Sequence, residues 1–389
     1  MEKILFRYNP WWEKDFLHPK TLPRPSIFQE MLENLSNKQV IFVTGLRRVG
    51  KTTLLKQTIK YLISHKKVQS KHILYVSLDD YLLAEKNILE IVEEYRKTHT
   101  LSFTQKIFLF LDEITYQKDF EQQLKNLYDN HNVKIFASSS SASILKSKKH
   151  FLTGRNSIIE VMPLNFSEYL EFKKIKLKKS DSHLTIKIFE DFMQTGGIPE
   201  FVLTGNSDYI QELVDDIIKK DIAAFYGVRD AKILQDFFLL LMERAGKIVS
   251  INKIANILDI SPDSAKRYLQ MFADAYLIYL VPRFGKTNER LLSAKKIYAA
   301  DLGIRSHFTG FRDKGSLFEN YIFLKIKKHN PTYLYQDGNE IDFIINKKYL
   351  IEVKYNSEMN DKQQALFEKM EVKNKLIIKN ISDAEKIDI

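Results

Sequence analysis

A glycine-rich turn between an apolar run and a helical pattern constrains the fold of this chain more than any other feature of the sequence. Residues 40–43 are typical of a buried strand, and apolar side chains recur at helical spacing from Leu54 onward. The order of strand, glycine loop and helix is that of a P-loop, in which backbone N–H groups and a helix N-terminus surround phosphate oxygens. We expect Lys51 to reach the β- and γ-phosphates and Thr52 to ligate Mg²⁺. The predicted nucleotide-binding residues are Gly45, Arg48, Val49, Gly50, Lys51, Thr52 and Thr53.

A second apolar run supplies the acidic residues that such a site needs. The run 108–111 ends in Asp112 and Glu113. We expect Asp112 to hold the Mg²⁺ through water, and Glu113 to orient or deprotonate the attacking water. Further strand-like runs at 72–78 and 133–137 are separated by stretches long enough for crossover helices. This rhythm predicts an α/β fold with a mostly parallel sheet covered on both faces, and the site predicts ATP hydrolysis with ATP and Mg²⁺ as cofactors.

Two further positions are candidates for contact with the transferred phosphate. Ser138 or Ser139, in a run of four serines after a predicted strand, could contact the γ-phosphate or the attacking water; a flexible loop explains the same run. Arg155 could stabilise transition-state charge, within its own subunit or across a subunit boundary. A surface salt bridge is the alternative role for this arginine.

Near the end of the chain, two strand-like runs flank a short loop at 346–348. Pairing across that loop places Asp342 opposite Glu352, with Lys354 on the same face. Facing carboxylates repel, so a fold tolerates them mainly when something positive lies between them. We expect Asp342 and Glu352 to ligate Mg²⁺ or Mn²⁺, Glu319 to add a third carboxylate, and Lys354 to position or activate the water that attacks a phosphodiester. Alternatively, Lys354 merely neutralises a structural acidic pair.

Composition limits the classes of protein and partner. Lysine and arginine number 60 against 49 aspartate and glutamate, which gives a formal net charge of +11. The excess is compatible with a polyanionic partner such as DNA, and equally with a lysine-rich genome composition. The absence of cysteine excludes disulfides, thiolate zinc sites and cysteine nucleophiles. No apolar run reaches the roughly 18 residues of a membrane helix, and the first ten residues lack a signal-peptide core, so we expect a cytoplasmic protein without a membrane partner.

The pattern along the chain predicts several segments. A helix-turn-helix is expected around the turn at 259–262, and its second helix carries Lys266 and Arg267, which are placed to touch DNA phosphates unless that helix packs within the molecule. The expected division is an N-terminal arm of extended chain with docked aromatic side chains (1–35), an ATPase core (36–165), a helical lid (166–235), the helix-turn-helix with a short β tail (236–285) and an α/β domain (286–389).

Taken together, the motifs resemble a known family. The segments that carry the resemblance are the P-loop, 111–113, 138–140, 152–155, 162–169, 196–200, 341–342 and 351–354. They are similar to those of the prokaryotic AAA+-like ATPases of archaea and bacteria that have a C-terminal domain of uncharacterised function. The resemblance implies an AAA+ core, a winged-helix domain and a C-terminal domain similar to PD-(D/E)xK nucleases. By position, Asp342 matches the motif aspartate, Glu352 and Lys354 match its ExK, and Glu319 matches the upstream acid, whereas Ile341 replaces the motif proline.

Three functions are compatible with these expectations. In the first, subunits form a homo-oligomeric ring that uses ATP to move or remodel duplex or branched DNA. In the second, ATP occupancy sets a conformational switch, and the C-terminal domain is an interaction module without catalysis. In the third, ATP licenses a metal-dependent DNA nuclease at the C-terminal acidic cluster.

Overall fold

The computed structural model describes residues 1–13, 21–142, 154–178, 181–387 and 389. The chain divides into two units, Met1–Met162 and Pro163–Ile389. Each unit has its own sheet and its own hydrophobic core. Residues 14–20 of the expected arm and residues 152–153 of the segment 152–155 lie outside the described residues.

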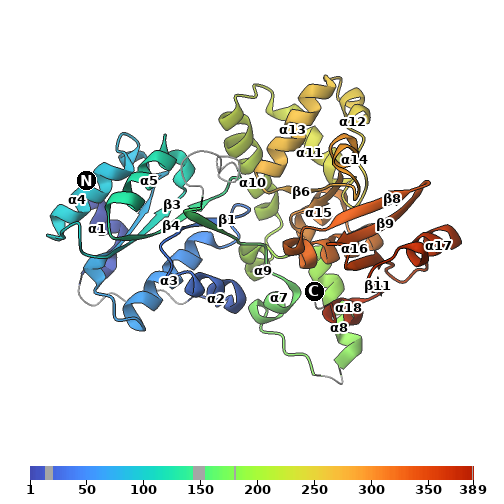
Figure 1. Cartoon of the computed structure of the whole chain (residues 1–389), viewed down its shortest axis with the longest axis horizontal. Helices are drawn as coiled ribbons and strands as arrows, with labels where there is room; N and C mark the ends of the chain where they lie inside the picture. Colours follow the sequence, from blue (N-terminus) through green and yellow to red (C-terminus); the bar gives the residue numbers. More distant parts are fainter. Residues whose placement is uncertain (14–20, 143–153, 179–180, 388) are drawn as a thin grey trace. The chain divides into compact units, whose positions relative to one another are not determined.

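The first unit is an α/β domain built on one parallel sheet in the order β2-β3-β4-β1-β5, which confirms the predicted sheet type (Figure 1). Its strands are β1 Val40–Thr44, β2 Ile73–Ser77, β3 Ile107–Asp112, β4 Val133–Ser139 and β5 Asn156–Glu160. Its helices are α1 Glu2–Tyr8, α2 Pro25–Glu33, α3 Lys51–Ser64, α4 Ile88–Thr98 and α5 Phe120–Asn130. Strand β5 has no counterpart among the predicted strands, because it is a half-buried edge strand without a continuous apolar run.

Helices cover both faces of this sheet. Val40 and Phe42 of β1 lie in the core formed with α1, α4 and α5, whereas α2 and α3 lie on the other side (Figure 1). Every residue of β1 is buried, which explains why its sequence is apolar without alternation. Because these strands are parallel, the carboxyl ends of β1, β3 and β4 lie at one edge of the sheet, and the P-loop follows β1 at that edge.

The N-terminal segment is helical where extended chain was expected. Pro10 begins a short 3-10 turn and Pro25 begins α2; proline suits the first helical positions, because the N–H that it lacks has no intrahelical partner there. The expected docking of aromatic side chains is present, since Trp12 stacks on Tyr95 with ring centroids 5.6 Å apart. Asn9 also fixes α1 to the sheet, because its side-chain amide donates to the carbonyl oxygen of Tyr75 in β2 at 2.8 Å and accepts the N–H of the same residue at 2.6 Å.

The second unit combines a helical part with two small sheets. Its helices are α7 Phe166–Phe172, α8 Ser182–Thr195, α9 Pro199–Thr204, α10 Asp208–Asp216 with the π-helical continuation Ile217–Ala224, α11 Ala231–Met242, α12 Ile251–Ile257, α13 Pro262–Asp274, α14 Thr287–Leu292, α15 Leu302–Thr309, α16 Lys314–Ile326, α17 Asp361–Lys369 and α18 Ile381–Glu385. Its strands are β6 Ile278–Val281, β7 Lys296–Ala299, β8 Thr332–Gln336, β9 Asn339–Ile345, β10 Tyr349–Val353 and β11 Asn374–Ile378.

The residues expected as a helical lid, 166–235, lie in the second unit. Phe189 of α8 lies edge-on to Phe318 and Tyr321 of α16, with ring centroids 5.8 and 4.9 Å apart. The same core includes the inner faces of β9 and β10.

The strand pairings of the second unit define the position of the acidic residues. β9 and β10 are antiparallel, with Ile345 opposite Tyr349, which confirms the expected register. β6 pairs with β7, so the sheet that follows helices α12 and α13 extends past residue 285, the expected domain boundary. Among the described residues, no helix is long and apolar enough to span a membrane.

A tight junction joins α8 to α15 within the second unit. A Cβ placed on Gly303 would lie 1.9 Å from the carbonyl oxygen of Thr195, so only glycine allows this approach. Asp301 is buried beside it and accepts an N–H from Gly197 at 2.6 Å. Burial raises the pKa of Asp301 to about 6, although its backbone hydrogen bonds oppose the shift.

Candidate functional site

The P-loop has the backbone geometry that its glycines predict. Gly45 has φ 137° and Gly50 has φ 101°, both in the region that favours glycine. A Cβ on Gly45 would lie 2.3 Å from the carbonyl oxygen of Val161, whereas nothing lies within 4 Å of one on Gly50. Arg24, which the sequence did not single out, donates to the carbonyl oxygens of Val49 and Met162 at 3.2 and 2.9 Å and so braces the loop from outside.

Lys51 is buried at the start of α3 and bonds the loop that precedes it. Its Nζ donates to the carbonyl oxygens of Gly45 and Leu46, both at 3.0 Å, and to the Oγ of Ser140 at 3.3 Å. The ammonium therefore lies inside the curve of the loop, with its charge directed to the carboxyl edge of the sheet. Of the other predicted nucleotide-binding residues, Arg48 and Thr53 are exposed and Val49 is buried.

Asp112 is held by three hydroxyl groups from three different elements. The Oγ1 of Thr52 and the phenol of Tyr75 each donate to Asp112 Oδ2 at 2.7 Å, and Ser138 donates to Oδ1. Burial and the Asp112 carboxylate raise the pKa of Tyr75 well above its usual value, so its phenol stays protonated as a donor. A hydroxyl and a carboxylate in contact beside a phosphate-binding loop are oxygen donors of the kind that Mg²⁺ prefers.

Glu113 lies next to Asp112 but in a different environment. Its backbone is in the left-handed region, with φ 53° and ψ 51°, a strained conformation for a residue with a Cβ. Its Oε1 accepts a hydrogen bond from Ser140 at 2.8 Å. Burial raises the pKa of Glu113, and the charge of Lys51 opposes this shift. A carboxylate with a raised pKa suits a base, because it takes a proton more readily than an exposed glutamate.

The serine run contributes in a way that differs from the expectation. Ser138 is fully buried behind Asp112, where it also accepts the N–H of Glu113 at 3.0 Å, so it positions acidic residues instead of facing a phosphate. Ser140 contacts both Lys51 and Glu113. The sequence contains four adjacent serines, whose side chains point to different sides of the chain at the end of β4. This alternation places Ser140, two positions after Ser138, beside Lys51 and Glu113.

Arg155 lies at the opposite end of β1 from the P-loop of its own chain. Its carbonyl accepts the N–H of Val40 at 2.8 Å, so it lies where β1 begins. The P-loop follows the other end of β1, five residues or roughly 16 Å away at about 3.3 Å per residue. The guanidinium of Arg155 is 3.4 Å from Asp129 and lies over the ring of Tyr128. This is the surface ion pair that was the alternative role.

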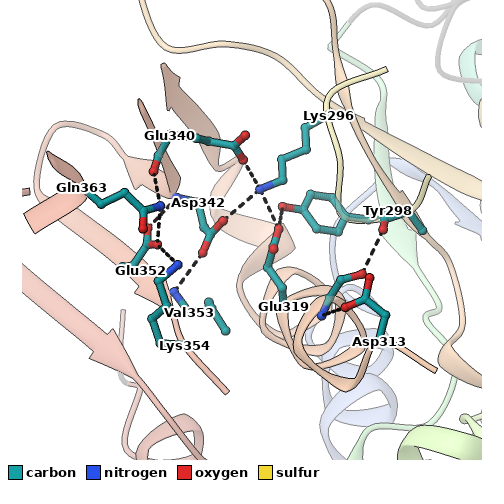
Figure 2. Close-up of polar contacts among 12 residues, drawn as sticks. Lys296, Tyr298, Asp313, Glu319, Glu340, Asp342, Glu352, Val353, Lys354 and Gln363 are labelled. Carbon is teal, nitrogen blue, oxygen red and sulfur yellow. Dashed lines mark hydrogen bonds and ion pairs between the residues drawn. The ribbon is translucent and has the colours of Figure 1, made fainter. Parts of the chain in front are cut away.

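In the second unit, Asp342 and Glu352 face each other across β9 and β10 (Figure 2). Glu352 accepts the N–H of Asp342 at 3.2 Å, and Asp342 accepts the N–H of Val353 at 2.9 Å. Lys354 Nζ is 2.7 Å from Glu352 Oε1, on the expected face. Burial, followed by the charge of Asp342, raises the pKa of Glu352 to about 8.

The positive group among these carboxylates is a lysine that the sequence did not reveal. Lys296 of β7 places its Nζ 2.7 Å from Glu319 and 2.9 Å from Asp342, and it also bonds Glu340 (Figure 2). Its side chain is 1% exposed. The ammonium of Lys296 lies between Glu319 and Asp342, two of the three carboxylates that were predicted to ligate Mg²⁺ or Mn²⁺ with Glu352, so the metal site stays a prediction that this contact opposes. Among the described residues, no three His, Cys, Asp or Glu side chains are arranged to hold a metal ion.

Some of these residues had a usable signal in the sequence. Glu340 is two positions from Asp342 and shares its face by strand alternation, and Lys296 directly precedes the apolar run 297–300. Tyr75 and Arg24 gave no signal, because their partners are distant along the chain.

Models of known protein families match three parts of the chain. Residues 37–170 match the model of an AAA domain, residues 186–315 match a domain of unknown function (DUF8612), and residues 314–388 match another (DUF4143). The uncharacterized protein MJ1544 of Methanocaldococcus jannaschii is 30% identical over 347 residues, which cover 83% of this chain and 76% of that protein. An uncharacterized protein of Haemophilus influenzae is 26% identical over 340 residues, 84% of each chain.

Among solved structures, the Walker-type ATPase PABY2304 of Pyrococcus abyssi is 14% identical, with 77% of this chain and 99% of that chain covered and a TM-score of 0.49. The AAA domain match includes Lys51, Asp112 and Glu113 and covers most of the first unit. The chain therefore belongs to the AAA-like ATPase family of archaea and bacteria that includes MJ1544.

Proposed function

We propose that the first unit binds ATP with Mg²⁺ and hydrolyses it at the carboxyl edge of its parallel sheet. The observation that supports this proposal is the convergence of three contacts: Thr52 with Asp112, Lys51 with the loop carbonyls, and Ser140 with both Lys51 and Glu113. These groups come from β1, α3, β3 and β4, so the fold itself brings them together.

Each residue has a defined task in this proposal. Lys51 exchanges its carbonyl partners for phosphate oxygens, which are stronger acceptors because they are charged. Thr52 and Asp112 hold the Mg²⁺, which when bound supplies charge neutralisation at the phosphate oxygens. Glu113 orients the attacking water and accepts its proton, and Ser140 fixes the direction of the Glu113 carboxylate.

Two substitutions separate binding from hydrolysis. Glu113→Gln keeps the shape of the side chain but removes the base, so we expect ATP binding near the wild-type level and hydrolysis reduced by about 10²–10⁴. Lys51→Ala should lose ATP binding itself. Binding is measured with a fluorescent ATP analogue and hydrolysis by phosphate release. Equal turnover in wild type and both variants would refute the assignment of the site.

We propose DNA as the partner of the second unit, which we interpret as a winged helix-turn-helix (α12, α13, β6 and β7) followed by a nuclease-like domain used for binding. Helix α13 exposes Lys266 and Arg267 on one side while its apolar side is buried, as in a helix that contacts phosphates. The net charge of +11 favours the same class of partner. In this proposal the subunits form a homo-oligomeric ring that moves or remodels DNA. Arg155 would then contact the nucleotide bound by a neighbouring copy.

The test is ATP hydrolysis without DNA and with single-stranded, linear duplex and four-way-junction DNA at low and moderate salt. Stimulation by one DNA form, weakened by salt, would support the motor. Lys266→Ala/Arg267→Ala should reduce this stimulation, whereas the charge-matched control Lys219→Ala/Lys220→Ala, at two other exposed lysines, should not. Turnover that no DNA form changes would instead favour a nucleotide-gated switch with a protein partner.

A further inference from the structure

The carboxylate cluster of the second unit contains its own cation. Lys296 offers three N–H groups, and the carboxylates of Glu319, Glu340 and Asp342 accept them (Figure 2). These acceptors come from α16 and β9, while Lys296 comes from β7. One ammonium therefore ties together three elements that are distant in the sequence.

The position of Lys296 is fixed by packing as well as by charge. It pairs with Val281 in the β6–β7 ladder, and its ammonium lies 5.8 and 6.0 Å from the ring centroids of Tyr298 and Phe343. Tyr298 in turn donates to Glu319 at 2.6 Å. With 1% of its side chain exposed, Lys296 is shielded from water in the folded chain.

The electrostatics favour a permanently charged lysine. Burial alone would lower the pKa of Lys296, but Asp342, Glu319 and the neighbouring acidic groups raise it well above its usual value. Its ammonium contacts an oxygen of each of the three carboxylates, so the cluster already contains the positive group that facing carboxylates require.

We propose that Lys296 is the resident cation of this cluster, occupying the position that a divalent metal would require, so that the second unit holds no metal there and performs no metal-dependent cleavage. A metal needs oxygen ligands at about 2.0–2.6 Å, and the oxygens of Glu319 and Asp342 already close on Nζ. The inference is independent of ATP hydrolysis, because it concerns only residues of the second unit.

The experiment compares Mn²⁺ binding by full-length wild type, Asp342→Asn and Lys296→Met without nucleotide, followed by the paramagnetic resonance signal of free Mn²⁺. Wild type and Asp342→Asn should give superimposable titrations, because the native cluster holds no metal. Lys296→Met removes the ammonium but keeps an unbranched side chain of similar length. It should gain one Mn²⁺ site, at least about tenfold tighter than any site in wild type, and lose it again in Lys296→Met/Asp342→Asn.

Thermal unfolding gives a second measurement. In EDTA at pH 8 Lys296→Met should unfold at a lower temperature than wild type, and Mn²⁺ should recover part of the loss. The matched control Lys354→Met, which removes a partly buried lysine paired with Glu352, should gain no Mn²⁺ site. If Lys296→Met does not fold, the comparison of wild type with Asp342→Asn still decides. An Asp342-dependent Mn²⁺ site in wild type, DNA cleavage that is lost in Asp342→Asn, or unchanged stability of Lys296→Met would each overturn the proposal.

Discussion

Tyr75 should be a positioning residue for Asp112, and Tyr75→Phe tests this role with the removal of a single oxygen atom. The phenol donates to Asp112 Oδ2 at 2.7 Å from a side chain that is 4% exposed. A hydrogen bond to a charged group contributes about 1.5–3 kcal/mol, so the first unit should lose about that much stability. Thr52 still bonds the same oxygen, but the carboxylate is no longer fixed from the side of β2.

Tyr95→Phe is the matched control. Tyr95 is equally buried and donates at the same distance of 2.7 Å, but to the neutral carbonyl of Lys71. Its loss should cost only about 0.5–1.5 kcal/mol and leave hydrolysis unchanged. Residues that orient a metal ligand typically contribute 10–100-fold to metal affinity or activity, so Tyr75→Phe should need about tenfold more Mg²⁺ for half-maximal hydrolysis.

Both measurements are direct. The chain has two tryptophans, Trp11 and Trp12, and both lie in the first unit, so tryptophan fluorescence during urea unfolding reports on that unit alone. Steady-state ATP hydrolysis is then measured against Mg²⁺ concentration for wild type and both variants. If Tyr75→Phe and Tyr95→Phe lose the same stability and both keep the wild-type Mg²⁺ dependence, Tyr75 has no positioning role.

Three further predictions concern packing and pH. Gly303→Ala should destabilise the second unit by about 1–3 kcal/mol, because the added methyl group would clash with a backbone carbonyl. Gly315→Ala, at the same position of the next helix, should stabilise this unit by about 0.5–1 kcal/mol, because a Cβ there would make only an ordinary contact with Asp313 at 3.9 Å. Calorimetry distinguishes the two variants, and equal effects would contradict the steric argument. Because the pKa of Glu113 is raised, hydrolysis should fall as the pH drops through that raised value, an acid limb that a pH–rate profile would show or exclude. Burial raises the pKa of Glu319 to about 7 and that of Glu352 to about 8, so the folded state binds these two protons more tightly than the unfolded chain does. Their contribution to stability is therefore complete below the unfolded pKa near 4.5 and is lost as the pH rises through 7–8. A free energy of unfolding that rises between pH 4.5 and 8 would contradict the assignment.

Local patterns in the sequence were sufficient for the nucleotide-binding loop and for most strands. A P-loop needs glycines at positions with positive φ, a preceding buried strand and a following helix. All three features are visible in the sequence within a segment of about twenty residues. The same holds for the pairing of Asp342 with Glu352, because a short hairpin loop fixes the register. The acidic pair after β3 was found in the same way, since a strand that ends in two carboxylates is a local feature.

Contacts between distant segments were decided by the tertiary structure. Tyr75 and Asp112 are 37 positions apart and meet because β2 and β3 are neighbours in a parallel sheet. The place of Arg155 depended on β5, an edge strand too polar to be recognised, which put the arginine at the opposite edge from the P-loop. Lys296 reaches Asp342 across 46 positions, and no spacing rule predicts which buried lysine will enter which cluster. The physical reason is common to all three cases. Hydrogen-bond spacing along one strand or helix fixes the local geometry, so local patterns are visible in the sequence. The partner of a buried polar or charged side chain depends instead on which strands and helices are neighbours in the fold, and packing decides that order.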